Sequence, residues 1–134
     1  MKPEEVEYVK LRIERARTSL KEAQLLIDSG FVIGGVNRLY YACFYAVNAL
    51  LFSEGLSSSR HSGVISLFER HWIKTDRLPV QMGKYYRQLF ERRQEGDYRD
   101  TAKFERQEVE EWLAEAQSFV GRIVQWLRDA GIDV

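Results

Sequence analysis

The residues best suited to chemistry lie in two short polar stretches of a sequence that is otherwise rich in apolar positions. In the first stretch, polar side chains recur every three or four residues and so share one face of a predicted helix: Asn37, Arg38, Tyr41, Tyr45 and Asn48. The second stretch closes another predicted helix with two basic residues, an acid and a tyrosine: Arg92, Arg93, Asp97 and Tyr98. Buried polar groups need partners, and an arginine needs an anion or several acceptors. Any chemistry is therefore expected where these two stretches meet.

Arg93 is the centre of the predicted site. It falls on the same helical face as the apolar residues Met82, Tyr86 and Leu89, so it is expected to point inward. Its guanidinium could bind a phosphate, which it matches bidentately. It could equally be a structural arginine paired with Asp97, or with Asp100, beside its own helix end. Both interpretations place the guanidinium next to acceptor oxygens.

The other polar residues also have two interpretations each. Tyr98 is either a buried anchor whose hydroxyl caps a helix end or a residue that contacts a nucleotide or is modified. Asn37, Arg38 and Tyr41 are expected to form a hydrogen-bonded network with Asp97 across the helices. We favour an architectural role for this network over direct catalysis.

The other residues with chemically reactive side chains are two histidines and one cysteine. His61 follows Arg60 at a predicted helix start, where free amides and the helix dipole favour an anion, although it could also be a first-turn histidine without a ligand. His71 is expected to pack beside Trp72, and Cys43 to be a small buried apolar residue. This set makes no convincing metal site, and we predict neither a metal nor another cofactor.

The elements that position these residues are helices. Apolar residues repeat at three and four over residues 6–27, with Gly30 following, and again over 33–54, with Gly55 following. A shorter helix carries Val64 to Phe68. The next runs over about 80–95, with Pro79 suited to its first position and Gly96 at its end, and the last covers 109–127. No segment alternates with period two. The sequence therefore predicts an all-α, up-and-down bundle of about five helices, with the long first and last helices as neighbours.

Length and charge narrow the class of protein. The 134 residues fit one domain over 1–134, and 20 basic residues balance 20 acidic ones. A protein that wraps duplex DNA usually carries a basic excess, so that function is not expected. We find neither a leader sequence nor an apolar run of membrane-spanning length, which predicts a cytoplasmic protein without membrane contact.

The order and spacing of three short motifs resemble the HEPN superfamily, all-helical domains that commonly dimerise and are named for nucleotide binding. The resemblance covers nearly the whole chain and is most specific to small stand-alone members. The motifs are Asn37-Arg38-x-Tyr40-Tyr41-Ala42, His61-Ser62-Gly63-Val64-Ile65 and Arg93-Gln94-Glu95-Gly96-Asp97-Tyr98.

The resemblance implies one of two activities. Many HEPN proteins are metal-independent RNases with a histidine four to six residues after an arginine, whereas others are partners of minimal nucleotidyltransferases in toxin–antitoxin pairs, some carrying AMP on a tyrosine near that motif. Here Asp97 and Tyr98 stand where that histidine would fall after Arg93. An imidazole exchanges protons near neutrality, but a tyrosine with a pKa of about 10 does not. RNase activity is therefore not expected.

Our leading hypothesis is a dimeric regulatory module that works with a separately encoded minimal nucleotidyltransferase. It would bind a nucleotide or the phosphate of single-stranded RNA near Arg93, with Tyr98 as a possible modification acceptor. The alternatives are a metal-independent RNase with a degenerate motif and a plain nucleotide-binding domain. A homodimer is predicted because the aromatic residues of two helices exceed what one five-helix core should bury: Tyr40, Phe44, Tyr85 and Phe90.

Overall fold

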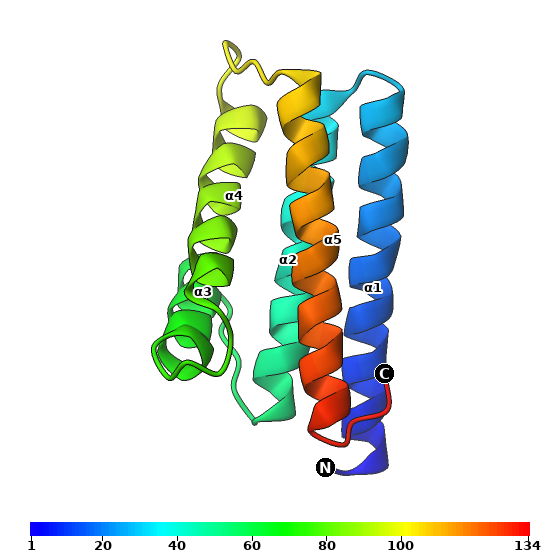
Figure 1. Cartoon of the computed structure of the whole chain (residues 1–134), viewed down its shortest axis with the longest axis vertical. Helices are drawn as coiled ribbons and strands as arrows, with labels where there is room; N and C mark the ends of the chain where they lie inside the picture. The colour runs from blue at the N-terminus through cyan, green and yellow to red at the C-terminus, as the bar shows by residue number, and fades with distance from the viewer.

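A computed structural model describes all 134 residues. Every regular element is helical and there are no strands, as the repeat of apolar residues indicates (Figure 1). The elements in chain order are α1 (Pro3–Asp28), α2 (Val32–Ser53), α3 (His61–Phe68), a π-helical turn (Glu69–Ile73), α4 (Val80–Tyr98) and α5 (Arg106–Asp129).

The helices form the expected up-and-down bundle. The long helices α1 and α5 pack against each other and against α2, which confirms that the two chain-end helices are neighbours (Figure 1). Helix α4 packs on the other side of α2, and α3 with the π-helical turn lies across the end where α4 begins. No helix has the length and apolar character needed to cross a membrane. The central position of α2 brings its polar face within reach of both α1 and α4.

Most helix ends lie where glycine allows the chain to leave the helix. Gly30 and Gly55 have φ values of +86° and +73° after α1 and α2, a region that residues with a Cβ avoid. The predicted end of α4 at Gly96 is wrong, because the helix continues to Tyr98. A Cβ at Gly96 would lie 3.1 Å from the Phe104 ring and 3.3 Å from Ile33. This glycine permits close packing and does not end the helix.

The connection between α3 and α4 is fixed by a stacked arginine. The Arg77 guanidinium lies 4.7 Å from the centroid of Trp72 and 4.9 Å from that of Trp126. It also forms an ion pair with Glu54 and donates to the carbonyl of His71. The helix after this connection begins at Val80, so that Pro79 is the residue before the helix and not its first residue. These contacts tie the base of α4 to α2 and α5.

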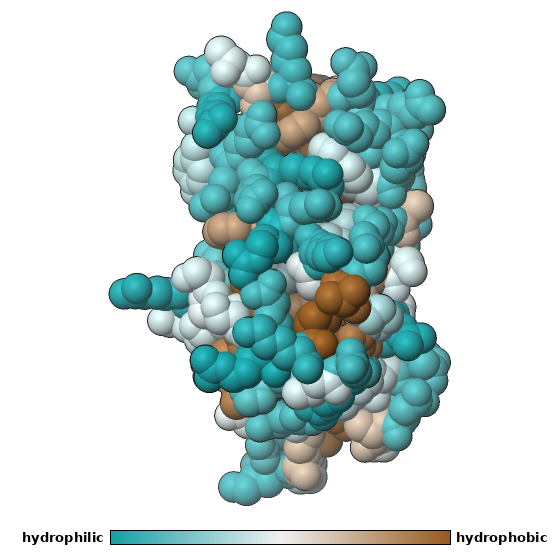
Figure 2. All heavy atoms as spheres, turned by 60° about the vertical axis from the view of Figure 1, so that its left-hand side comes forward, coloured by the Kyte–Doolittle hydropathy of each residue, from teal (hydrophilic) through white to brown (hydrophobic).

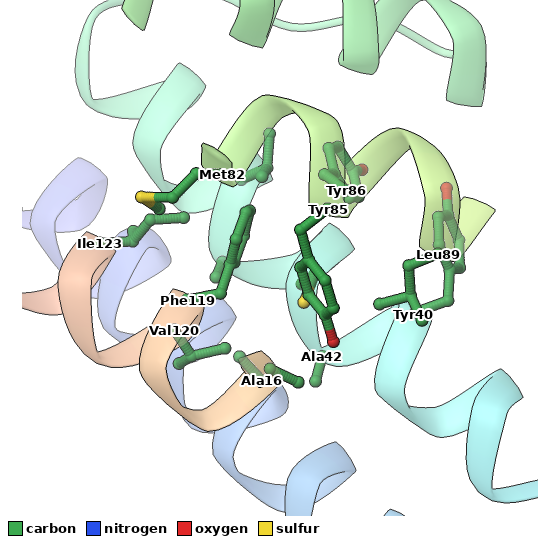
Figure 3. Close-up of a cluster of buried hydrophobic side chains, with 14 of the residues drawn as sticks. Ala16, Tyr40, Ala42, Met82, Tyr85, Tyr86, Leu89, Phe119, Val120 and Ile123 are labelled. Atoms are coloured by element: carbon green, nitrogen blue, oxygen red, sulfur yellow. The ribbon is translucent and has the colours of Figure 1, made fainter. Parts of the chain in front are cut away.

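The core is rich in aromatic residues that come from one chain. Figure 3 shows Tyr85 reaching inward from α4 beside Phe119 of α5, and its hydroxyl donates to the Trp112 carbonyl at 2.7 Å. Tyr40 and Tyr85 are almost completely buried, so the expectation that one core cannot bury them is wrong. Of the four aromatic residues on which that expectation rested, only Phe44 and Phe90 are half-buried.

One face of the molecule consists mainly of hydrophilic side chains. Figure 2 shows this face as largely hydrophilic, with hydrophobic groups gathered in a few small patches. The larger apolar side chains that stay exposed include Leu25 near the end of α1, Phe31 just before α2, and Val80 at the start of α4. Single exposed apolar residues are normal, so they do not by themselves define a site.

Candidate functional site

Arg93 occupies the position between α4 and α2 that its helical face predicts. Only 6% of the residue is exposed, and its guanidinium carbon lies 4.8 Å from the centroid of Tyr40, 5.6 Å from Phe90 and 5.7 Å from Tyr41. Its one ion pair, with Asp97, is 3.5 Å long, and the buried Nε has no hydrogen-bond partner. The structure thus holds a positive charge among aromatic rings, with one long ion pair and an unpartnered Nε.

A chain of polar contacts connects Arg93 with the outer surface of α1. The side-chain amide of Asn37 donates to Asp97 at 2.9 Å, and the Asn37 oxygen accepts from Arg38 Nε at 3.1 Å. Arg38 in turn lies 3.5 Å from the Glu22 carboxylate. The expected network of Asn37 and Arg38 with Asp97 is therefore present, and it joins α1, α2 and α4.

Two predicted site residues relate to Arg93 differently from expectation. Tyr41 has no side-chain hydrogen bond and instead packs its ring against Arg38, at 5.0 Å, and Arg93. Arg92 points away from the site and lies 3.9 Å above the ring of Trp112 on α5. Adjacent residues of a helix face different directions, so the fold brings Arg93 and not Arg92 to the polar network.

Tyr98 is 74% exposed at the last residue of α4, so the interpretation as a buried anchor is wrong. Its ring centroid is 6.0 Å from the Arg93 guanidinium carbon. Beside it lies a surface recess of about 410 Å³ that is lined also by Glu91, Gln94, Glu95 and Arg99. The hydroxyl of a tyrosine so placed is open to another macromolecule.

His61 is brought into the same aromatic cluster by the fold. It is the first residue of α3, and its ring packs against three rings that also contact Arg93: Tyr40, Tyr41 and Phe90. Its Nδ1 is 2.5 Å from the Tyr40 hydroxyl, and its closest aromatic neighbour is Phe44, at 4.7 Å between centroids. Examination of the residues that follow Arg93 in sequence could not reveal this histidine, because α3 precedes α4 and approaches it only in the folded chain.

Burial also determines the charge of these groups. Burial, and next the positive charge of Arg93, lower the pKa of His61 below its ordinary value, so its imidazole is neutral at pH 7. Burial raises the pKa of Tyr40, which therefore keeps its proton. The second histidine, His71, packs beside Trp72 as expected. No group of three histidine, cysteine or acidic side chains is arranged to hold a metal ion.

The lowered pKa of His61 predicts a loss of stability in acid. The unfolded chain binds a proton to this residue at about pH 6.5, whereas the folded chain resists it. The stabilisation is present above that pH and is lost as the pH falls through the folded pKa. We expect the urea midpoint to fall more steeply from about pH 7 to 5 in the wild type than in His61→Asn, which does not titrate. Parallel pH profiles would contradict the assignment.

Proteins of similar sequence come from bacteria and archaea. A protein of Thermotoga maritima named "UPF0332 protein" is 42% identical over 115 residues, which cover 86% of this chain and 87% of that protein. "Putative toxin MJ0142" of Methanocaldococcus jannaschii is 34% identical over 115 residues, covering 86% and 78% of the two chains. "Putative toxin MJ0605" of the same organism is 30% identical over 123 residues, covering 92% and 91%.

A family model adds to this similarity. The model of the HEPN domain matches residues 9–128, a span that begins in α1, ends in α5 and includes every residue of the Arg93 cluster. The chain therefore belongs to the HEPN domain family.

Proposed function

We propose that this protein is a dimeric, cytoplasmic HEPN regulatory module that binds a nucleotide or the phosphate of single-stranded RNA at Arg93. It acts with a separately encoded minimal nucleotidyltransferase, as half of a toxin–antitoxin-like pair. The observation that carries the proposal is the state of Arg93, which is 6% exposed and has a single ion pair of 3.5 Å. Two of the related proteins have the word toxin in their names, which supports the same class.

A phosphate is the ligand that best suits Arg93. Burying a guanidinium costs free energy unless its donors are paired, and here Nε has no partner. Asp97 compensates only in part, because its Oδ2 also accepts from Asn37. A phosphate oxygen would supply the missing acceptors in the bidentate geometry that arginine favours.

Tyr98 suits contact with a protein partner. Its side chain is exposed, lies at the end of α4 and is close enough to Arg93 for one ligand to touch both. A nucleotidyl group attached to the Tyr98 hydroxyl would carry its phosphate into the neighbourhood of the Arg93 charge. This arrangement supports Tyr98 as the residue that is modified and Arg93 as the residue that binds the attached phosphate through its charge.

The proximity of His61 favours one alternative, a metal-independent RNase that uses Arg93 and His61. RNA cleavage beside a 2′-hydroxyl needs a proton acceptor and a proton donor near neutral pH. One electrostatic donor such as Arg93 contributes roughly a hundred- to a thousandfold in rate and does not replace that pair. The lowered pKa of His61 leaves it a poor proton donor at pH 7. We therefore place binding ahead of cleavage.

The experiment combines binding, cleavage and assembly on the purified protein. The fluorescence anisotropy of a labelled, 5′-phosphorylated, single-stranded oligoribonucleotide should rise as protein is added. The oligoribonucleotide should remain intact in EDTA over hours.

Light scattering at micromolar concentration should give twice the mass of the chain. The minimal nucleotidyltransferase encoded beside it should co-elute with it and label wild-type protein but not Tyr98→Phe. Robust metal-independent cleavage would place the RNase first, and a lack of binding together with a monomeric mass would overturn the proposal.

A further inference from the structure

The hydrogen bond between Tyr40 and His61 determines where the imidazole carries its proton. Tyr40 is completely buried, and His61 Nδ1, 2.5 Å away, is the hydrogen-bond partner of its hydroxyl. Burial raises the pKa of Tyr40, so the hydroxyl keeps a hydrogen that it can donate to Nδ1. Nδ1 is then the acceptor, and a neutral imidazole places its own hydrogen on Nε2. In this tautomer the free edge of His61 is a donor.

This donor lies at the positive end of a helix. His61 is the first residue of α3, and the earliest amide of that region bonded to a backbone carbonyl is that of Val64, to Arg60. The amides of Ser62 and Gly63 belong to the first turn, whose N–H groups have no acceptor within a helix. A Cβ at Gly63 would lie 2.0 Å from the Ser58 hydroxyl oxygen, so the preceding loop packs closely against this turn.

A second, independent feature points to a ligand at the same place. Arg93 presents a guanidinium whose buried Nε has no partner, and it packs on the same three rings as His61. The positive charge of Arg93 is also felt by His61, whose pKa it helps to lower. One aromatic cluster is thus contacted by three groups that can bind an anion. They are the start of α3, the N–H donor of His61 and the Arg93 guanidinium of α4, whose Nε has no partner. Each of them is suited to an acceptor oxygen, and together they suit an anion.

We propose that His61 is a ligand-binding residue of the Arg93 site, where its Nε2–H donates to an oxygen of the phosphate that the guanidinium binds. The inference rests on the proposed function and adds the donor that completes it. It also assigns His61 a role other than proton transfer. Its Nδ1 lone pair is engaged by Tyr40 and its Nε2 already carries a hydrogen, so the neutral ring has no free lone pair with which to accept a proton from a ribose hydroxyl.

Three substitutions at one position separate these roles. His61→Phe keeps the aromatic packing and removes both nitrogens, whereas His61→Gln restores an N–H donor close to the position of Nε2. His61→Asn keeps an acceptor for Tyr40 but lacks the outer donor. With adenosine 5′-monophosphate and inorganic phosphate as calorimetric probes, we expect His61→Phe and His61→Asn to weaken binding about tenfold, and His61→Gln to recover most of it.

A spectroscopic measurement tests the tautomer without any ligand. Nitrogen-15 NMR of the free wild-type protein should show an unprotonated Nδ1 and a protonated Nε2 in His61, and Tyr40→Phe should remove that preference. Circular dichroism and a thermal midpoint establish which variants are folded, and the NMR result stands even where His61→Phe does not fold. A proton fixed on Nδ1 overturns the inference, as does wild-type affinity in a folded His61→Phe protein.

These outcomes also distinguish the inference from the function on which it rests. If wild-type protein binds the probes and Arg93→Met does not, while all His61 variants bind normally, the phosphate site stands and His61 is not part of it. If wild-type protein binds neither probe nor the oligoribonucleotide, the phosphate site and the role of His61 are overturned together.

Discussion

An Arg93→Met protein is expected to fold with at least the stability of the wild type and to bind nucleotide phosphate tenfold to a hundredfold more weakly. The wild-type guanidinium is buried with one long ion pair and an unpartnered Nε, so its desolvation is poorly compensated. Replacing a buried ion pair by apolar groups is often neutral or stabilising, and removing one partner is costly only when the charge left behind is buried and unpaired. Here the Asp97 side chain is 24% exposed and keeps its hydrogen bond from Asn37, so little cost is expected from the charge that remains. The loss of affinity corresponds to about 1.5–3 kcal/mol for hydrogen bonds to a charged group.

The length of the methionine side chain is essential to this prediction. It can still lie against Tyr40, Tyr41 and Phe90. Asp97, whose side chain is 24% exposed, keeps its hydrogen bond from Asn37. Arg93→Ala, by contrast, leaves a cavity beside those rings and should lower the free energy of unfolding by about 1–3 kcal/mol. Urea unfolding and calorimetric titration of the two variants measure both effects.

Arg92→Ala is the matched control, since Arg92 lies on Trp112 and away from the polar network. It should bind the ligand like the wild type. If Arg93→Met is destabilised as much as Arg93→Ala, then Arg93 is a structural residue. Retention of full affinity in Arg93→Met would remove it from the binding site altogether.

The second large effect is expected at Gly35, where α2 approaches α1. A Cβ on this residue would lie 2.6 Å from Cγ1 of Ile27, a distance at which one of the two helices has to shift. Ile27 is completely buried and has no free direction in which to move. We expect Gly35→Val to lower the free energy of unfolding by about 1–3 kcal/mol or more through overpacking. Chemical denaturation measures this loss directly.

The preceding residue supplies the control. At Gly34 the nearest atom to an added Cβ is a Leu26 methyl group at 3.4 Å, an ordinary contact. Gly34→Ala should therefore gain the helix propensity of alanine, up to about 1 kcal/mol, without a clash. Opposite signs at two adjacent glycines would show that close packing of α1 on α2 is the cause. Equal effects at both positions would refute that explanation.

The fold could be predicted from the sequence because local signals and packing agree along most of the chain. Apolar residues at three and four define the inner faces of α1, α2 and α5, and Gly30 and Gly55 end the first two helices with positive φ. The agreement fails at Gly96, which packs against Phe104 from a segment that follows α4. A local pattern does not distinguish a glycine needed for a turn from one needed for close approach.

The candidate site was only partly predictable for a related reason. The position of Arg93 follows from its helical face, and the contacts of Asn37 and Asp97 follow from two polar groups that must be paired. The approach of His61 depends on how α3 lies across the end of the bundle, and no periodicity within α3 encodes that angle. The exposure of Tyr98 depends likewise on where α4 leaves the bundle.

The aromatic rings that cover Arg93 affect how fast a ligand could bind and leave. Only 6% of Arg93 is exposed, so a ligand at the proposed site would reach the guanidinium fully only if the surrounding rings moved, and we expect opening to precede capture. The rate of association then levels off at the rate of opening as ligand concentration rises, and a chain with zero net charge adds no long-range steering of polyanions. Release has to pass the same barrier. Slow entry and slow exit would give the bound state of the proposed site a long lifetime, which would suit a regulatory protein more than one that turns over substrate.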